Sequence, residues 1–404
     1  MPINKETMPS ISEKPSYFHL VNDGEPFRLL FPVGFLLGLI GVLLWPVWVW
    51  KWMDVYPSLM HSRIMVQGFL SAFVMGFLGT AFPRMIEARK LGTLFSIPWA
   101  LALVAACGIH LLQLHLVGDI LYFLTLLSFV LTLANRLRER KDLPPPVFVL
   151  VFAGLACALL GTLLQIAQQL VPEVLPLQAF PLSRLLLNQG FLLLPVMGVG
   201  AHFLPRFFGQ TSLQKYADSI HPPLWWIRDA FISGTFGLAI IVSFFFESYG
   251  WFRTAYTVRA ATILIYFIKE FPAFKSKGST GSLATAARVA LLSLPLAYLA
   301  MIFQPLYSTS LAHIVFITGF SLLALSVATW VLLGHSGCSH LCKASLWQIR
   351  LLWIFVFLAM LTRVSADWMP DLRFTHYAYA AIVWSIGTIV WAVRFLPRVR
   401  IPDE

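Results

Sequence analysis

Long runs of apolar residues follow one another along the chain, and polar residues gather in short segments between them. A backbone that crosses lipid has to satisfy its own hydrogen bonds, and a helix needs roughly 20 residues to cross about 30 Å of hydrocarbon. The runs of sufficient length predict an all-α fold, a polytopic membrane bundle of twelve transmembrane helices. The predicted helices are residues 29–50, 61–83, 94–116, 118–136, 147–170, 184–207, 224–247, 250–270, 284–306, 310–333, 346–366 and 375–396.

The polar segments predict the domain organisation and the orientation of the bundle. We expect a tail of residues 1–28, one transmembrane domain of residues 29–396 and a short tail of residues 397–404. Most Lys and Arg residues lie in the two tails and in the loops after the even-numbered helices. Cytoplasmic loops of membrane proteins are enriched in these residues, so both tails are predicted to lie in the cytoplasm.

Composition supports a membrane protein and argues against a nucleic-acid binder. Charged residues make up only 12% of the chain and hydrophobic residues 58%, whereas soluble domains carry about 25% charged residues. The formal net charge is +11, but the basic residues cluster between apolar runs and form no continuous polar face. We therefore expect the lipid bilayer as the main partner of the chain, and no nucleic acid.

A pattern in the second predicted helix recurs in the sixth helix, 122 positions further along the chain. The matching segments are Gln67-Gly68-Phe69-Leu70, Met75-Gly76 and Pro83-Arg84, followed by Gln189-Gly190-Phe191-Leu192, Met197-Gly198 and Pro205-Arg206. The tenth helix has a fainter echo in Gly319-Phe320. Glycine-rich apolar helices can look alike because small residues let helices approach closely. We favour duplication, which predicts three four-helix repeats with the second, sixth and tenth helices equivalent and central.

Four histidines near the ends of these central helices are candidate metal ligands, because imidazole is the commonest ligand and polar groups are costly in a membrane. His61 and His313 begin the second and tenth predicted helices, so both lie near the expected periplasmic face. We predict that they hold one haem iron, although a histidine at a helix end is often only an interfacial polar residue. His202 and His335 lie near the opposite face and form a candidate second site for haem or copper.

Other residues offer weaker signals. Arg363 and Arg373, between the last two helices, are candidate partners of haem propionates, although arginine is also common at membrane interfaces. Cys338-Ser339-His340-Leu341-Cys342 resembles a soft-metal cluster but lacks a C-x-x-C spacing, so its role stays open. His110 and His115 have no partner in this scheme.

Three segments resemble the NnrS family of bacterial membrane proteins. They are residues 25–31 at the start of the first helix, residues 61–69 with His61, Met65 and Gly68, and Gly334-His335-Ser336-Gly337 after the tenth helix. The resemblance implies a multi-pass protein of the bacterial inner membrane that contains haem and copper. It also implies a role in the response to nitric oxide and in tolerance of nitrosative stress.

The chain departs from the family pattern in two places. Many members carry a second histidine and an acid where this chain has Arg63 and Ile64, and an arginine where it has Trp330. A guanidinium does not ligate a metal, so the expectation of copper is weakened. The expectation of haem between His61 and His313 is unaffected.

A more distant resemblance is topological. Haem–copper oxidases and nitric oxide reductases also have twelve central helices, with a low-spin haem between histidines of the second and tenth. Their paired histidines in the seventh helix have no counterpart here, since residues 224–247 contain no histidine. We therefore do not predict oxygen reduction.

Two functional hypotheses follow. The first is a haem b protein that transfers electrons from a quinol or a cytochrome, or that acts on nitric oxide; whether it is an enzyme stays open. Two histidine ligands leave no open position on iron, which favours electron transfer. The alternative is a secondary transporter without a redox cofactor, in which Gln67, Gln189, Asn188, Gln165 and Arg259 line a substrate path between rocking repeats.

Overall fold

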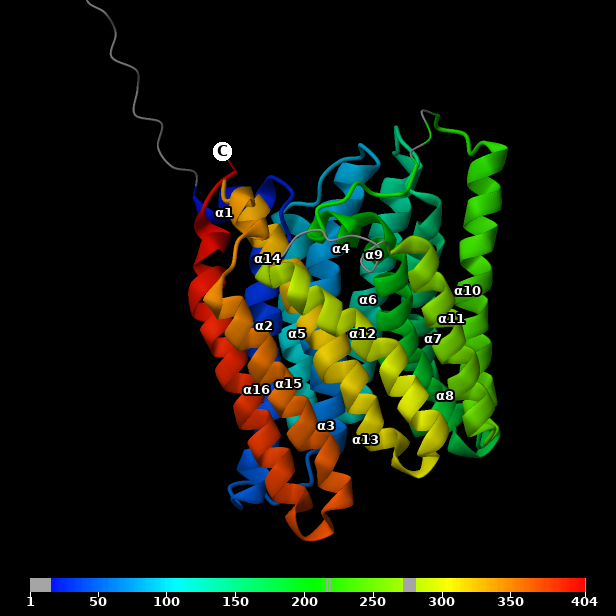
Figure 1. The fold of residues 1–404 in the computed structure, drawn as a ribbon, viewed down its shortest axis with the longest axis vertical. Coiled ribbons are helices and arrows are strands. Elements are labelled where there is room, and N and C mark those ends of the chain that lie inside the picture. The colour runs from blue at the N-terminus through cyan, green and yellow to red at the C-terminus, as the bar shows by residue number, and fades with distance from the viewer. Residues whose placement is uncertain (1–15, 216, 218, 272–280, 404) are drawn as a thin grey trace, which may run out of the picture.

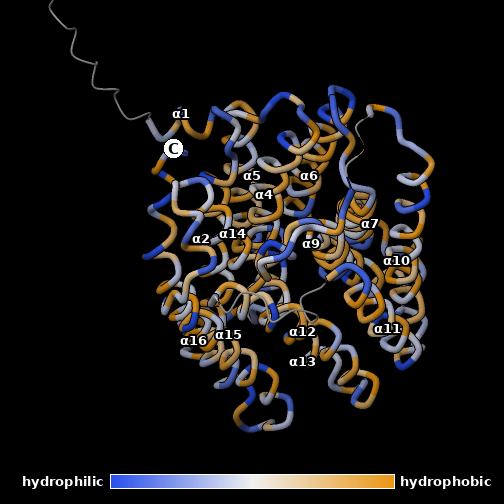
Figure 2. Tube along the Cα trace, turned by 45° about the horizontal axis from the view of Figure 1, so that its top comes forward, coloured by the Kyte–Doolittle hydropathy of each residue, from blue (hydrophilic) through white to orange (hydrophobic). Residues whose placement is uncertain are grey.

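The computed structural model describes residues 16–215, 217, 219–271 and 281–403. Throughout these ranges the chain is helical and contains no strand, as the sequence predicts. Figure 1 shows a bundle of long helices that run between two ends. Figure 2 shows hydrophobic residues along the helices and hydrophilic residues mainly near the two ends.

Eleven helices in the described ranges are long and apolar enough to cross a membrane. They are α2 (Phe27–Val49), α3 to α4 (Ser58–Met85), α5 (Thr93–Leu111), α6 (His115–Arg138), η2 with α7 (Pro146–Leu170), α8 to α9 (Ala179–Phe207), α10 (Leu224–Ser248), α12 (Ser282–Phe303), η6 to α14 (Pro305–Gly334), α15 with η9 (Trp347–Trp368) and η10 to η11 around α16 (Pro370–Arg400). Short elements α1 (Tyr17–Asn22), η3 (Pro172–Val174) and η8 (Ser339–Lys343) lie outside them.

The remaining long helix, α11 (Phe252–Glu270), completes the predicted twelve-helix bundle. It is less apolar than the others because it carries Arg253, Arg259, Lys269 and Glu270. It packs between α10 and α12, so its charged residues have neighbouring helices to contact. The fold is thus an all-α, multi-pass membrane bundle.

Two of the three helices predicted to be central are the most buried of the eleven, whereas the third, Pro305–Gly334, is buried to 61%, the same as α2. In their most apolar stretches, 83% of the residues of the Ser58–Met85 helix and 72% of those of the Ala179–Phe207 helix are buried. The segment α1 and the described C-terminal end lie together at one end of the bundle, as expected for an even number of crossings. The elements α3 and α13 lie at the opposite end (Figure 1).

One predicted boundary is displaced. The sequence predicts a helix over residues 94–116, but α5 ends at Leu111 and α6 begins at His115. The turn between them depends on Gln113, whose φ of 64° lies in the left-handed region. Apolar neighbours on both sides conceal this turn in the sequence, so His115 belongs to α6 and not to the third helix.

Each of the three helices predicted to be equivalent contains a π-helical segment after a short α-helix. The three combinations are α3 (Ser58–Arg63) with η1 (Ile64–Leu70), α8 (Ala179–Leu185) with η4 (Leu186–Gly190), and α13 (Ser308–His313) with η7 (Ile314–Ser321). The helices then continue as α4 (Ser71–Met85), α9 (Phe191–Phe207) and α14 (Leu322–Gly334). The first two π-helical segments begin at positions 64 and 186, the same offset as the sequence match. The π-helix is rare and is frequent at functional sites; the threefold repeat itself stays a prediction.

Candidate functional site

His61 of α3 is held against the first spanning helix. Its Nδ1 lies 2.9 Å from the carbonyl oxygen of Gly41 in α2. A carbonyl oxygen only accepts hydrogen bonds, so Nδ1 carries the proton and Nε2 presents a lone pair. The two helices approach closely at Gly41, because a Cβ at this position would lie 2.9 Å from Sδ of Met65, whose side chain would have to shift. The indole of Trp45 packs edge-on against the imidazole, with ring centres 5.7 Å apart.

His313, the last residue of α13, has the same arrangement. Its Nδ1 lies 2.8 Å from the carbonyl oxygen of Thr309, one turn earlier. Within the described part of the chain, Nε2 of neither His61 nor His313 has a hydrogen-bond partner. Metal-binding histidines commonly donate their other ring N–H to a backbone carbonyl, which fixes the tautomer and the orientation of the ring. Both imidazoles are therefore prepared to present Nε2 to a metal.

Arg363 of α15 lies near both histidines. Arg363 is close enough for its charge to interact electrostatically with both imidazoles. His61 and His313 are also close enough to interact electrostatically with each other. The side chain is 8% exposed; its guanidinium lies 4.0 Å from the ring centre of Tyr377 and donates to Oγ of Ser310 at 3.4 Å. No carboxylate of the described residues forms a salt bridge with it. A buried cation with no carboxylate in salt-bridge contact is costly in a membrane, so this position favours an anionic ligand.

Arg373, the second predicted propionate partner, has a different environment. Its Nε lies 3.4 Å from Oδ1 of Asp367, which also accepts a hydrogen bond from the hydroxyl of Tyr377 at 3.1 Å. Arg373 therefore forms a salt bridge with Asp367, whereas Asp367 acts on Arg363 only at longer range. The structure thus brings His61, His313 and Arg363 together at the end of the bundle that carries α3 and α13.

The residues that position these side chains could not be identified from the sequence. Gly41 supplies a carbonyl, Trp45 packs on His61, and Ser310 donates to the carbonyl of Val364 at 3.0 Å and so links α13 to α15. Every residue has a backbone carbonyl, so residue type does not show which carbonyl accepts a hydrogen bond. Only the spacing of small residues in the first helix hinted that another helix approaches it closely.

The structure gives His202 and His335 different neighbours. His202 of α9 is 2% exposed, and its ring nitrogens lie 3.5 Å from Arg206 and 3.5 Å from Ser212. His335, directly after α14, lies 2.8 Å from Glu25 and 2.9 Å from Asp403. A second metal site between the two histidines therefore stays a prediction.

Glu25, His335 and Asp403 form the one group of potential metal ligands found among the described residues, with all ligand atoms within 4.8 Å of one another. Two guanidinium groups already engage these carboxylates. Arg84 donates to Oε1 of Glu25 at 2.5 Å, and Arg28 contacts both Glu25 and Asp403. Since two cations balance two carboxylates, we interpret this group as an ion-pair network and not as a metal centre.

This network predicts a pH-dependent stability. Burial alone would raise the pKa of Glu25, but hydrogen bonds from His335 and Arg84 outweigh it and lower this pKa to about 2. A lowered pKa means that the ionised carboxylate stabilises the folded state above about pH 4.5, and that this stabilisation is lost as the pH falls toward 2. Glu25→Gln should therefore lower the unfolding temperature at pH 7 by about 2–4 °C, and by less at pH 3.

Thermal unfolding of the purified protein in detergent measures this difference. Asp229→Asn is the matched control, because Asp229 pairs with the exposed Arg228 and surface ion pairs contribute little. A difference between wild type and Glu25→Gln that is as large at pH 3 as at pH 7 would contradict the prediction.

A buried polar network joins the second spanning helix to its neighbours. Arg63 pairs with Asp119 through two contacts of 2.8 and 2.6 Å, and Gln67 donates to the same carboxylate at 2.8 Å. Nε2 of His110 lies 2.8 Å from Oε1 of Gln67, and the Nδ1 atoms of His110 and His115 are 3.3 Å apart. The two histidines that had no partner in the sequence analysis therefore belong to this network.

A comparable network surrounds Gln189, the position equivalent to Gln67 in the sequence match. Arg259 pairs with Glu247 at 2.8 Å and donates to Oε1 of Gln189 at 3.0 Å, and the hydroxyl of Tyr298 donates to the same oxygen at 2.8 Å. An acidic residue within an apolar run, such as Glu247, could have indicated such a network from the sequence alone. A charged side chain inside a membrane needs a partner, so an acid there predicts a nearby base or hydrogen-bond donor. The Gln67, Gln189 and Arg259 side chains of the transporter hypothesis are thus engaged within the protein.

The cysteine-containing segment after α14 does not form a compact ligand set. The ligand atoms of Cys338, His340 and Cys342 are not among those of the described residues that lie within 4.8 Å of one another. Burial raises the pKa of the Cys342 thiol to about 11. The thiol form therefore predominates at neutral pH in the absence of a metal.

The sequence matches a known protein family. The family model described as NnrS protein matches residues 24–402, nearly the whole chain. No curated protein matches the sequence.

Proposed function

Because the chain belongs to the NnrS family, we propose that it is a haem-binding redox protein of the bacterial inner membrane with a role in the response to nitric oxide. The observation that carries the proposal is the pair His61 and His313. Each donates Nδ1–H to a backbone carbonyl and keeps Nε2 free of described partners, on two helices that both approach Arg363.

The residues present fit haem b. His61 and His313 would hold the iron through Nε2, and the unpaired guanidinium of Arg363 would neutralise a propionate. Arg373 adds positive charge at the same end but keeps Asp367 as its partner. When bound, haem supplies one-electron redox chemistry, with a potential set by its axial ligands, its burial and its surroundings.

The chain's own residues orient and shield this site. The Gly41 and Thr309 carbonyls fix the two imidazole rings, Trp45 covers one of them, and Ser310 holds Arg363 near both. Two histidine ligands leave no open position, so we propose electron transfer from a quinol or a cytochrome as the primary activity. Direct chemistry with nitric oxide would need a second metal, copper or haem, at His202 or His335.

Arg363→Gln tests the assigned propionate partner. Removing a buried positive charge disfavours the reduced state of the cofactor, so the midpoint potential should fall by roughly 30–60 mV, a threefold to tenfold change in a one-electron equilibrium. A redox titration followed by absorbance measures this shift. Arg373→Gln is the control, because Arg373 is already neutralised by Asp367 and should change the potential less. Equal shifts in the two variants would remove Arg363 from the site.

A test in cells addresses the biological role. Cells that lack the gene should grow more slowly than wild type in the presence of a nitric oxide donor, and the wild-type gene should restore growth. A gene encoding His61→Ala should not restore it. Full restoration by that variant would contradict a haem-dependent role.

A further inference from the structure

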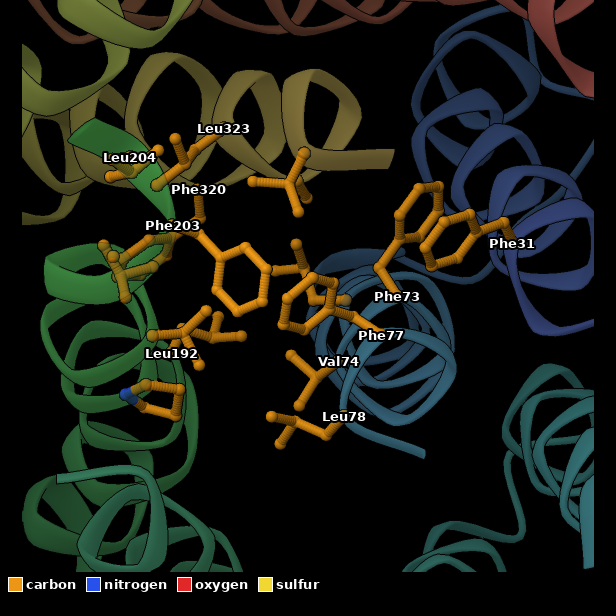
Figure 3. Close-up of a pocket in the computed structure, with 17 residues that line it drawn as sticks. Phe31, Phe73, Val74, Phe77, Leu78, Leu192, Phe203, Leu204, Phe320 and Leu323 are labelled. Carbon is orange, nitrogen blue, oxygen red and sulfur yellow. The ribbon is translucent and has the colours of Figure 1, made fainter. Parts of the chain in front are cut away.

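The three helices predicted to be equivalent do not close completely where they meet. A cavity of about 110 Å³ lies between them, and its walls come from α4, α9, η7 and α14, with one residue each from α2 and η1. Figure 3 shows the rings of Phe77 and Phe320 directed into this space, with Phe73 stacked against Phe31 on the side of α2, and Phe203 and Leu192 on the side of α9. Bulky phenyl rings thus surround the space without filling it.

The lining contains no polar side chain. All 17 lining residues are aliphatic, aromatic, proline or glycine, and none of them carries a hydroxyl, amide or charged group. A buried water needs two to four polar partners, so a cavity with this lining stays dry. A polar or charged ligand would lose its hydration without compensation. The lining therefore selects uncharged, apolar occupants.

The volume limits the size of the occupant. In another protein, an engineered dry cavity of about 150 Å³ binds benzene or xenon. A space of about 110 Å³ holds a molecule of a few heavy atoms, whereas a quinone ring with its tail or a porphyrin would extend out of it. Such an occupant makes dispersion contacts with the lining side chains, which lack these contacts when the cavity is empty.

We propose that this cavity is a binding site for a small, uncharged, apolar molecule, the class that includes dissolved diatomic gases. The helices that line it also carry the two candidate ligands: Leu70 follows His61 by nine positions, and Phe320 follows His313 by seven. At 1.5 Å per residue the cavity lies roughly 10–14 Å along the bundle from the histidines. The site concentrates such molecules beside the candidate redox centre, but its existence does not depend on haem.

Xenon is a suitable probe, because it is apolar, uncharged and detectable by ¹²⁹Xe NMR. Wild-type protein in lipid nanodiscs should give a signal of bound xenon that empty nanodiscs do not give. Ala324→Phe, which places a ring into the cavity wall, should abolish this signal. Ala105→Phe is the matched control, because it adds the same ring at an exposed position of α5 and should leave the signal unchanged.

Several outcomes would overturn the proposal. They are a xenon signal no larger than that of empty nanodiscs, an equal signal in wild type and Ala324→Phe, or a lipid acyl chain resolved inside the cavity. If Ala324→Phe fails to fold, Val74→Phe fills the same cavity from α4. The His313→Ala variant should retain the xenon signal, so a failure of the haem proposal is distinguishable from a failure of this one.

Discussion

His313→Ala should abolish the haem spectrum of the purified protein, and His61→Ala should do the same. Changing even an outer partner of a metal ligand costs 10–100-fold in affinity, so loss of the ligand itself should leave little bound haem. The measurement is the haem-to-protein ratio, with absorption spectra of the oxidised and dithionite-reduced protein. The sharp reduced bands expected of wild type should disappear in both variants.

Two controls separate loss of a ligand from loss of the fold. His376→Ala removes a histidine that contacts Ser365 and should retain haem. His313→Gly leaves space for imidazole added to the buffer, which should restore part of the spectrum if the protein is folded. Bands that persist unchanged in both His61→Ala and His313→Ala would place the ligands elsewhere.

Asp119→Leu should produce the largest loss of stability among single changes. Asp119 is fully buried and holds Arg63, which is 8% exposed. Removing one partner of a buried ion pair leaves an uncompensated charge and costs about 3–5 kcal/mol. Unfolding of the purified protein by denaturant in detergent measures the loss as a change in the free energy of unfolding.

The double variant Arg63→Leu/Asp119→Leu provides the contrast. Replacing both members of a buried pair with apolar residues is often neutral or stabilising. We therefore expect the double variant to be more stable than Asp119→Leu alone. A single variant within about 1 kcal/mol of wild type would show that water or another group compensates Arg63.

Most of the fold could be predicted from the apolar runs, because a lipid-crossing backbone has almost no alternative to the helix. The error at the turn before His115 has a local cause, the left-handed conformation of Gln113 between apolar residues. The π-helical segments could not be predicted, because apolar sequence is compatible with either hydrogen-bond pattern.

The candidate site could be predicted only in part. His61, His313 and Arg363 are recognisable from residue type and depth alone. Their supports are not, because the Gly41 carbonyl and the Ser310 hydroxyl act through backbone geometry and contacts between separate helices. The pairs of Arg63 with Asp119 and of Arg259 with Glu247 likewise depend on which helices become neighbours.

The contacts of Arg28 impose an order of events on biosynthesis. Its Nη1 donates to the carbonyls of Val399 at 2.9 Å and Ile401 at 2.6 Å, residues that leave the ribosome 371 and 373 positions later. During insertion Arg28 has only its neighbour Glu25 as a charged partner within the first helix region. These hydrogen bonds between the two ends of the chain can therefore form only after residues 399–401 have been synthesised, and a chain stalled before that point leaves Arg28 without them.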